Sequence, residues 1–458
     1  MTMIKKSHQP DNLENIPADN RLPGLPHLFG HMQVIRALVS NLKNTTMELA
    51  EFRSVYVRYK PATNCIVAYI AKFVDGVSGK TFDTWLYGKC FTPEGYAVAI
   101  VKANAHRGDE SAFLNPIISA PDDYVIFYVF PYDCEIKELP TVCDSRKISR
   151  ILHDIDDFFS RSAWRISDKR LKIEVVRYKP EKRAVVKIES RAVNRTDHKK
   201  KTLTVYLRTY CDDRGKVIYD TMRELHRTLY SHPEVKVPRA LGYIDEKRFL
   251  LTEGLAGNPL VELLKFPLRR DAFIKTAGAL AVLHQITDVS IAERNSKDLM
   301  DDARATGETL KQIVPEIADS VRAILNQLEP LHDKAARGSA GFVHGDFHCG
   351  QILIEKNSTV ILDFDRSFWG ETLFDVGNFC AHLHIIGRQN RWDDTQEMID
   401  TFVAHYEKAI HKKLDKKRLK LWTAYGLFLF SVSPFRSMEP DWKSSVIATV
   451  QECKRILS

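Results

Sequence analysis

The stretch "VHGDFHCGQILIE", Val343–Glu355, gathers the side chains of this sequence that are best suited to chemistry. It holds two histidines, an aspartate, a cysteine and a glutamine between apolar segments. Either this loop does chemistry, or it is a turn whose polar groups satisfy one another. A second aspartate, Asp363, follows in "TVILDFDRS". The apolar runs "QILI" and "TVIL" enclose "EKNS", which predicts a β-hairpin with Asn357 and Ser358 in its turn.

A hairpin returns the chain to its starting point, so we expect Asp363 beside Gln351 and near Asp346. One carboxylate and one amide oxygen at the open end of a hairpin are ligands that Mg²⁺ accepts when it carries nucleotide phosphates. A second carboxylate a few ångströms away could orient an attacking hydroxyl. This spacing therefore indicates phosphoryl transfer.

The elements before this loop contain an apparent internal repeat. Arg58-Tyr59-Lys60-Pro61 recurs as Arg177-Tyr178-Lys179-Pro180, and the same offset of 119 pairs Lys89 with Arg208. Both copies alternate apolar and polar residues around a proline-containing turn, as β-hairpins do. Self-similarity at a fixed offset predicts an internal duplication.

The order of predicted elements gives the fold class and the domain boundaries. The second copy continues into a predicted helix, Val217–Tyr230, and helical patterns such as Arg269–Ile286 dominate after about residue 256. We expect an α+β protein with two β-rich units and one mostly helical unit. The predicted divisions are a polar lead-in with a helix (1–45), a degenerate β-rich repeat (46–150), a second β-rich unit (151–255) and a helical unit with the loop (256–458).

Composition limits the classes of partner. The 458 residues carry a formal net charge of +8, which suits an anionic ligand but is too dispersed to argue for nucleic acid. Eight scattered cysteines without a Cys-x-x-Cys pair favour a reduced, intracellular protein. The first residues lack the apolar core of a secretory signal, and the run Leu421–Phe435 is too short to span a bilayer. We therefore expect a cytoplasmic protein without nucleic-acid or membrane partners.

The central motif resembles that of the aminoglycoside phosphotransferase family, which has a protein-kinase-like two-lobe fold. The family's His-Gly-Asp-x-His-x-x-Asn stretch matches His344, Gly345, Asp346, His348 and Gln351. Its second hairpin strand matches "LDF", its following aspartate matches the one in "ETLFDVGNFCAHL", and its Leu-Ala-x-Leu-His helix resembles "AGALAVLHQI". The resemblance covers roughly residues 165–400, and the first unit would be an extra, degenerate small lobe.

The resemblance implies roles for individual residues. Asp346 would be the catalytic aspartate, and Gln351 and Asp363 would hold Mg²⁺ against the phosphates of ATP or GTP. Arg208 would take the place of the small-lobe lysine and pair with Glu224. The remaining implied nucleotide contacts are the basic turn residues Lys179, Lys182 and Arg183 and the backbone of Glu253–Leu255 within the "TEGLAG" connection.

Several residues around the motif are expected to have structural roles. Asp375 is expected to cap the catalytic loop, and His344 and His348 to hold its backbone. His284 is expected to be a hydrogen-bonded core histidine, and Cys349 a packing residue rather than a reactive thiol. A metal site formed by His344, His348 and Asp346 is the less favoured alternative.

Three positions depart from the family pattern. Gln351 replaces asparagine and adds a methylene to a metal ligand, Arg208 replaces lysine, and the turn "YKPEKRA" is not glycine-rich. The leading hypothesis is an ATP- or GTP-dependent O-phosphotransferase acting on a sugar, amino sugar or amino alcohol. Asp365, Arg366 and Trp369 are possible contacts to such an acceptor, or parts of a plain turn.

The alternative hypothesis is a catalytically weak or inactive nucleotide-binding protein in which the first unit serves as a docking module. A protein kinase is disfavoured, because no long activation segment separates Asp363 from Asp375. The first unit is expected to pack on the small lobe, to cap the cleft, or to join two subunits in a homodimer.

Overall fold

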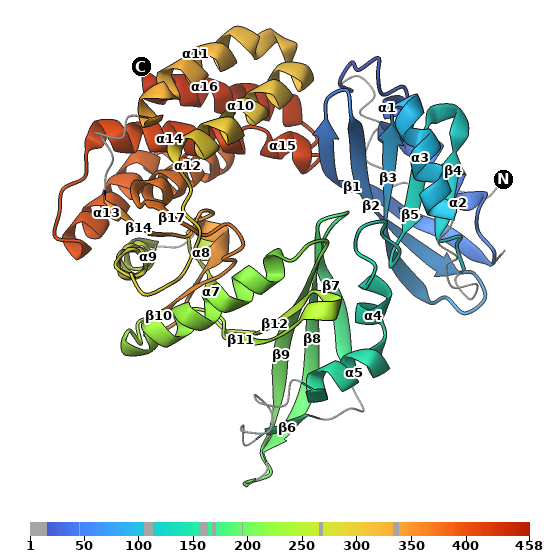
Figure 1. Ribbon diagram of the computed structural model, residues 1–458, viewed down its shortest axis with the longest axis horizontal. Helices are drawn as coiled ribbons and strands as arrows, with labels where there is room; N and C mark the ends of the chain where they lie inside the picture. The colour runs from blue at the N-terminus through green and yellow to red at the C-terminus, as the bar shows by residue number, and fades with distance from the viewer. Residues whose placement is uncertain are drawn as a thin grey trace.

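The computed structural model describes residues 16–44, 46–104, 113–154, 164–166, 171–194, 196–264, 269–332 and 339–458. Two twisted β-sheets and a helical body surround a common centre (Figure 1). The N-terminal sheet lies on one side, the second sheet lies below, and the helices of the C-terminal half complete the ring. The expected α+β class, with two β-rich parts before a mostly helical part, is confirmed.

The first part is a five-stranded antiparallel sheet with order β1-β2-β3-β5-β4. Alternation of buried and exposed residues along β1 is what a sheet with one covered face requires. Its elements are α1 (Leu25–Phe29), α2 (His31–Val39), β1 (Met47–Lys60), β2 (Asn64–Asp75), β3 (Thr81–Phe91), α3 (Pro93–Asn104), β4 (Ile117–Ala120), β5 (Val125–Val129), α4 (Leu139–Cys143) and α5 (Ser145–Asp154).

The second part is a sheet in which β7 pairs with β8 and the order continues β8-β9-β12-β11, with β6 added beside β8. The helix predicted over Val217–Tyr230 is present as α7. The elements are β6 (Trp164–Ile166), β7 (Lys172–Lys179), β8 (Arg183–Asn194), β9 (Lys200–Tyr210), α7 (Arg214–Thr228), β10 (Val235–Lys236), β11 (Ala240–Ile244) and β12 (Phe249–Glu253).

The two sheets share one strand order and one register. β1-β2-β3-β5-β4 corresponds to β7-β8-β9-β12-β11, with a helix after the third strand in both. The offset of 119 seen in the sequence also relates the strand ends. It joins Lys60 to Lys179 and Phe91 to Tyr210. The common topology supports the predicted duplication, which stays a prediction.

The C-terminal part is helical around two short hairpins. It contains β13 (Asn258–Pro259), α8 (Leu260–Leu263), α9 (Arg269–His284), α10 (Ser296–Ile313), α11 (Ala318–Leu328), β14 (Ala340–Val343), β15 (Ile352–Ile354), β16 (Thr359–Ile361), β17 (Phe368–Glu371), α12 (Leu373–Asn390), α13 (Thr395–Ala409), α14 (Lys416–Phe430), α15 (Ser433–Arg436) and α16 (Trp442–Leu457). The apolar run Leu421–Phe435 lies largely in α14, as its buried-helix interpretation predicts.

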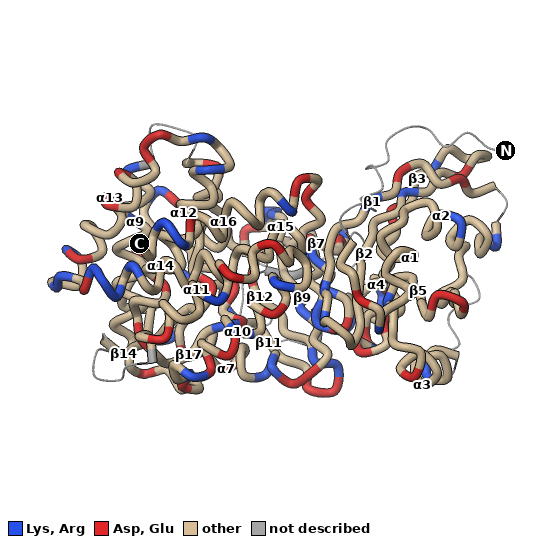
Figure 2. Tube along the Cα trace, turned by 90° about the horizontal axis from the view of Figure 1, so that it is seen from above, with Lys and Arg blue, Asp and Glu red and all other residues tan. Residues whose placement is uncertain are grey.

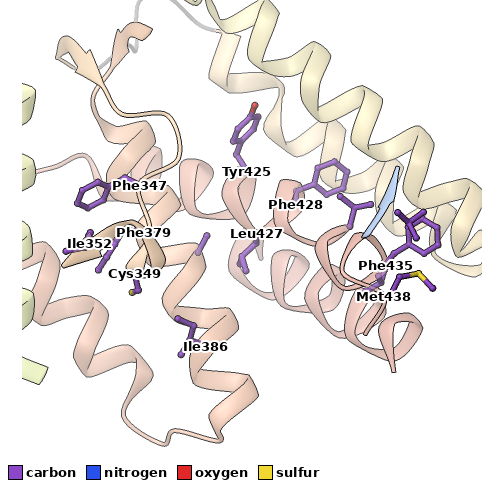
Figure 3. Close-up of a cluster of buried hydrophobic side chains, with 14 of the residues drawn as sticks. Phe347, Cys349, Ile352, Phe379, Ile386, Tyr425, Leu427, Phe428, Phe435 and Met438 are labelled. Carbon is purple, nitrogen blue, oxygen red and sulfur yellow. The ribbon is translucent and has the colours of Figure 1, made fainter. Parts of the chain in front are cut away.

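A hydrophobic cluster fixes the segment 347–352, which contains part of the candidate catalytic loop, to these helices. Phe347 packs on Phe379 of α12 with ring centroids 5.6 Å apart, and Figure 3 shows Cys349 and Ile352 in the same cluster. All four side chains are buried. Burying side chains of this size stabilises the fold by about 2 kcal/mol each, so the loop starts from a rigid base.

The first unit contacts both other parts of the molecule. Phe29 of α1 stacks against Phe435 of α15 with centroids 6.3 Å apart, and the side-chain amide of Gln312 donates to the carbonyl of Ala18 at 2.8 Å. On the other side, Arg58 of β1 forms an ion pair with Glu181 in the β7–β8 turn. The first unit therefore bridges the second sheet and the helical part.

Charges of both signs are spread along the whole tube of the chain (Figure 2). No extended single-sign stripe stands out there, in agreement with the dispersed charge of the sequence. None of the helices in the described ranges is long and apolar enough to cross a bilayer.

Candidate active site

The hairpin predicted around "EKNS" is present. β15 and β16 pair antiparallel with Ile352 opposite Ile361, and the N–H of Leu362 donates to the carbonyl of Gln351 at 2.9 Å. This bond places Gln351 and Asp363 at the same open end of the hairpin, as expected. The preceding residues Cys349–Gln351 form one 3₁₀ turn that links the loop to β15.

Asp375 of α12 holds the loop that precedes the hairpin through hydrogen bonds to its backbone. Its carboxylate is fully buried and accepts from the backbone N–H of His344 at 2.6 Å and of Gly345 at 2.9 Å. Nε2 of His284 lies 3.1 Å from the same carboxylate, and its Nδ1 lies 2.7 Å from the hydroxyl of Tyr406. These contacts are those of a loop cap and a hydrogen-bonded core histidine.

His344 is bonded through both ring nitrogens. Nδ1 accepts from the backbone N–H of Asp346 at 3.2 Å, so Nε2 carries the proton and donates to the carbonyl of Leu362 at 2.8 Å. The ring thus ties the start of the loop to the end of the hairpin. With both nitrogens engaged, it has none left for a metal ion, which removes the alternative His344–His348–Asp346 metal site.

Gly345 permits the close passage of two backbone segments. Its φ is +79°, in the left-handed region, and a Cβ there would lie 2.1 Å from the carbonyl oxygen of Arg366. Glycine adopts this conformation without the steric cost paid by other residues. The Arg366 segment can therefore pack directly under the loop that presents Asp346.

Asp363 stands in a strained backbone conformation with φ of +61°. Non-glycine residues in this region are uncommon and concentrate at functional sites. Its carboxylate lies 3.2 Å from a guanidinium nitrogen of Arg183 and 3.5 Å from one of Arg208. Burial alone would raise the pKa of Asp363, but Arg208 and Arg183 outweigh burial and hold it well below its usual range. The carboxylate is therefore ionised, and it is paired with both guanidinium groups.

Arg208 does not pair with Glu224. The guanidinium of Arg208 on β9 lies 2.8 Å from Asp365, while Glu224 on α7 accepts from the backbone N–H of Ser290 at 2.6 Å. The expectation of an Arg208–Glu224 pair is wrong, because the carboxylates after β16 reach Arg208 and a backbone donor of the helical part satisfies Glu224.

Asp365 is also engaged by the small lobe. It pairs with Arg183 and Arg208 and lies 3.3 Å from the hydroxyl of Tyr210. These contacts bind the turn after β16 to the second sheet. Asp365 is thus a link between the two lobes in this structure, rather than a free group for an acceptor.

The β7–β8 turn brings basic side chains to the same side. Lys179 is partly buried, whereas Lys182 is exposed. Burial, together with the nearby charges of Arg177 and Arg183, lowers the pKa of Lys179 to about 7. Burial and neighbouring cations destabilise the charged form of this ammonium group, and a phosphate oxygen beside it would stabilise that form. The turn therefore favours an anionic ligand even without a glycine-rich sequence.

His348 and Cys349 behave as supports. Nδ1 of His348 accepts from the backbone N–H of Gly350 at 3.0 Å, and its ring lies 4.6 Å from that of His382. Burial lowers the pKa of His348. Cys349 is fully buried, and burial raises the pKa of its thiol, so the side chain packs and is not a ready thiolate.

Among the backbone N–H groups of Glu253–Leu255 in the connection between the lobes, that of Leu255 has no acceptor in the described part of the chain. The N–H of Glu253 donates to the carbonyl of Arg239, and that of Gly254 donates to the carbonyl of Thr204. The N–H of Leu255 donates to no group in the described part of the chain. The side chains of Glu253 and Leu255 line a pocket of about 240 Å³ against the end of α7. Of the implied adenine contacts, the N–H of Leu255 is the available donor.

The residues present fit a nucleotide with a divalent cation. The buried Nε of Arg208 has no hydrogen-bond partner among the described residues, which a phosphate oxygen would supply. Asp363 and Gln351 offer the hard oxygen ligands that Mg²⁺ takes. Within the described ranges no group of three or more His, Cys, Asp or Glu side chains could hold a metal ion.

Sequence reasoning missed the role of Glu181. It sits at the tip of the β7–β8 turn, and its carboxylate lies 2.7 Å from Lys89 and 2.6 Å from Arg58 of the first unit. The repeated "RYKP" word contains Arg58, and the same offset matches Lys89 with Arg208. Nothing in the sequence indicated that Arg58 and Lys89 would contact a carboxylate of the second β-rich unit.

The phosphotransferase enzyme family model matches residues 185–419, slightly more than half of the chain. The chain belongs to this family. The match contains the candidate catalytic loop and the hairpin and begins after the first unit.

Shorter segments match curated relatives. A methylthioribose kinase of Bacillus velezensis is 34% identical over 105 residues, which are 21% of this chain and 24% of the relative. A methylthioribose kinase of Bacillus pumilus is 28% identical over 146 residues, 31% of this chain and 32% of the relative. The match spans only about a quarter to a third of the length of these relatives.

Solved structures resemble the chain more distantly. A choline kinase from Cryptosporidium parvum aligns with a TM-score of 0.48 at 14% identity, over 68% of this chain and 95% of that one. A choline/ethanolamine kinase family protein from Mesorhizobium loti aligns with a TM-score of 0.44 at 14% identity, over 63% and 88%.

Proposed function

We propose that this chain transfers the γ-phosphate of ATP or GTP to a hydroxyl group of a small molecule. The observation that carries the proposal is the meeting of Gln351 and Asp363 at one hairpin end, opposite Arg208 of the small lobe. Asp346 stands on the loop that Asp375 and His344 fix beside this end. Phosphoryl transfer needs little more than positioning and charge neutralisation, which this arrangement supports.

Each residue then has a defined task. Asp346 would accept the proton of the acceptor hydroxyl, and Asp363 and Gln351 would hold Mg²⁺. Mg²⁺, when bound, supplies charge neutralisation on the phosphate oxygens. Arg208, Lys179 and Lys182 would contact the phosphates, and the N–H of Leu255 would donate to the nucleobase.

A sugar, amino sugar or amino alcohol is the proposed acceptor class. The family membership supports a small hydroxylated molecule, and the partial similarity to methylthioribose kinases favours a sugar-like one. The acceptor would lie between the Asp346 loop and the helices of the C-terminal part.

The ion pairs of Asp363 favour a second candidate function. With Arg183 and Arg208 on its carboxylate, the cation position competes with two guanidinium groups. A protein that binds a nucleotide but transfers phosphate slowly would have this arrangement, together with the longer Gln351 ligand.

One screen separates the two candidates. Thermal shift of the full chain with Mg²⁺–ATP or Mg²⁺–GTP is measured against a panel of sugars and amino alcohols, because a specific ligand stabilises the folded state by mass action. Each stabilising compound is then assayed for phosphorylated product. Product from any of them supports the transferase, and nucleotide stabilisation without product from the whole panel supports the slow or inactive binder.

Lys179 gives the nucleotide affinity a pH dependence. Its pKa of about 7 in the free protein means that it is largely neutral at pH 8. A phosphate contact favours the charged form, so binding takes up a proton above pH 7. We expect the association constant to fall by up to about tenfold per pH unit between pH 7.5 and 9.5.

Calorimetric titration across that range checks this prediction. Lys179→Arg is the matched control, because a guanidinium stays charged throughout and its slope should be flat. Equal slopes for both proteins would show that Lys179 does not meet the phosphates.

A further inference from the structure

The tip of the β7–β8 turn is held by the N-terminal unit. Glu181 has a φ of +59°. Its carboxylate is surrounded by Arg58, Lys89 and Cys134 of the first unit, which together form what we call the cradle. Arg58 contacts its carboxylate at 2.6 Å and Lys89 at 2.7 Å, and the thiol of Cys134 lies at 3.0 Å. Its backbone N–H donates to the carboxylate of Asp133 at 2.8 Å. Both the main chain and the side chain of this one turn residue are thus fixed.

The contact is buried on both sides. The side chain of Glu181 is 8% exposed, and those of Arg58 and Lys89 are 15% and 14% exposed. Burial acts to raise the pKa of Glu181, but Lys89 and Arg58 outweigh it and the pKa lies below its usual range. Removing one partner of a buried ion pair leaves an uncompensated charge, so this contact is costly to break.

The cradle occupies the position in the first unit that the candidate nucleotide site occupies in the second. Arg58 matches Arg177 and Lys89 matches Arg208 at the offset of 119. Lys89 binds a carboxylate of the unit that follows it, as Arg208 binds Asp363 and Asp365 of the helical part. The first unit retains the anion-binding position and fills it with Glu181.

The same turn carries the groups that would meet phosphate. Lys179 and Lys182 flank Glu181 in the chain, and the N–H of Lys182 donates to the carbonyl of Lys179 at 3.1 Å. Arg183, the next residue, reaches Asp363 at 3.2 Å. Holding Glu181 on one side of the turn therefore sets where these three cations lie on the other side.

We propose that Arg58 and Lys89 are positioning residues that hold the 179–183 turn through Glu181 and thereby set nucleotide affinity. This inference rests on the proposed function, because it assigns the turn to the nucleotide phosphates. Neither residue contacts the nucleotide. The first unit acts as a fixed outer support for the phosphate-binding turn.

The experiment uses the full chain and four substitutions. Glu181→Gln removes the ion pairs with both Arg58 and Lys89, and Lys89→Met removes only the pair with Lys89. The Glu181→Gln/Lys89→Met double variant measures whether the two substitutions act through the same contact, and Lys89→Arg retains the charge. Glu371→Gln is the matched control, because Glu371 forms a buried bidentate pair with Arg418 in the helical part, with side chains 7% and 5% exposed. Hydrogen exchange of a peptide covering 179–183, and KM and kcat for the nucleotide, are measured for each.

The single variants should exchange the turn amides about tenfold faster or more and raise the KM for nucleotide about tenfold, with kcat within about twofold of wild type. The double variant should be no worse than Glu181→Gln, and Lys89→Arg should restore both readouts. Glu371→Gln should lower thermal stability and should change neither the turn exchange nor KM.

Three results would overturn the inference or its basis, and they differ. Unchanged turn exchange in a folded Glu181→Gln protein would show that the ion pair does not hold the turn. Faster exchange with an unchanged KM would show that the held turn does not position phosphate-binding groups. A wild-type protein that binds neither ATP nor GTP would remove the proposed function itself, and the turn exchange would then still report whether the cradle holds Glu181.

Discussion

Asp346→Asn is expected to lower kcat for phosphate transfer by about three orders of magnitude, the range that a positioned general base contributes. Asparagine has nearly the same shape, and the backbone N–H of residue 346 would keep its bond to Nδ1 of His344. The loss would therefore come from the missing proton acceptor and not from a displaced loop. Nucleotide affinity should stay within about threefold of wild type, since the ground-state contacts remain.

The measurement is initial-rate transfer to the best acceptor of the thermal-shift screen, with nucleotide binding followed separately. Asp319→Asn is the control, because this aspartate is 88% exposed and forms an ion pair with Arg322 three residues on. If Asp346→Asn kept more than a tenth of the wild-type kcat, Asp346 would not be the group that takes the proton.

Asp375→Ala is expected to be strongly destabilising, by about 4 kcal/mol. The buried carboxylate accepts from two backbone N–H groups and contacts His284, and alanine would leave these donors without partners at about 1–3 kcal/mol each. The loop carrying Asp346 would lose its support at the same time. We expect the melting temperature to fall by about 4 °C for a chain of 458 residues that unfolds as one unit, and transfer activity to fall with it.

Asp415→Ala provides the comparison. Asp415 also accepts from two backbone N–H groups, those of Lys417 and Arg418, but it caps the exposed start of α14, where such a cap contributes about 1 kcal/mol. Thermal unfolding of both variants, followed by circular dichroism, checks the prediction. Similar melting temperatures for the two variants would contradict a special role for the buried carboxylate.

Local patterns predicted the core of the candidate site. Apolar periodicity and turn residues predicted the hairpin around "EKNS" and the return of Gln351 beside Asp363. They also predicted helices over 217–230 and 269–286, which the structure has at 214–228 and 269–284. These features depend on residues close in the chain. The resemblance to the phosphotransferase family, carried by the same loop, led to the family that the comparison confirms.

Long-range partners could not be predicted in the same way. The partner of Arg208 depends on how the second sheet packs over the turn after β16. Arg208 therefore pairs with Asp365 and Asp363 and not with Glu224. The Glu181–Lys89 contact joins the two β-rich units, and a predicted repeat indicates similar folds without indicating how the two units pack. Burial around Lys179 also has no local sequence signal.

The first unit contacts both lobes of the molecule. It contacts α15 through Phe29 and the β7–β8 turn through Arg58, so any change in the relative position of the lobes must break one of these contacts or move the first unit with it. The Arg183 and Arg208 pairs to Asp363 and Asp365 add a direct link between lobes. A bound nucleotide would exchange some of these ion pairs for phosphate contacts.

Calorimetric titration of the wild-type chain and Asp363→Asn with ATP and GTP, each with and without Mg²⁺, tests the central claim most directly. Asparagine tolerates the left-handed backbone at this position, and Asp365 would still pair with Arg183 and Arg208. The predicted result is that at least one nucleotide binds the wild type more tightly with Mg²⁺, and that Asp363→Asn loses this enhancement. If neither nucleotide bound the wild type at millimolar concentration, or if Mg²⁺ enhanced binding equally in both proteins, the pocket at Asp363 would not be a metal–nucleotide site.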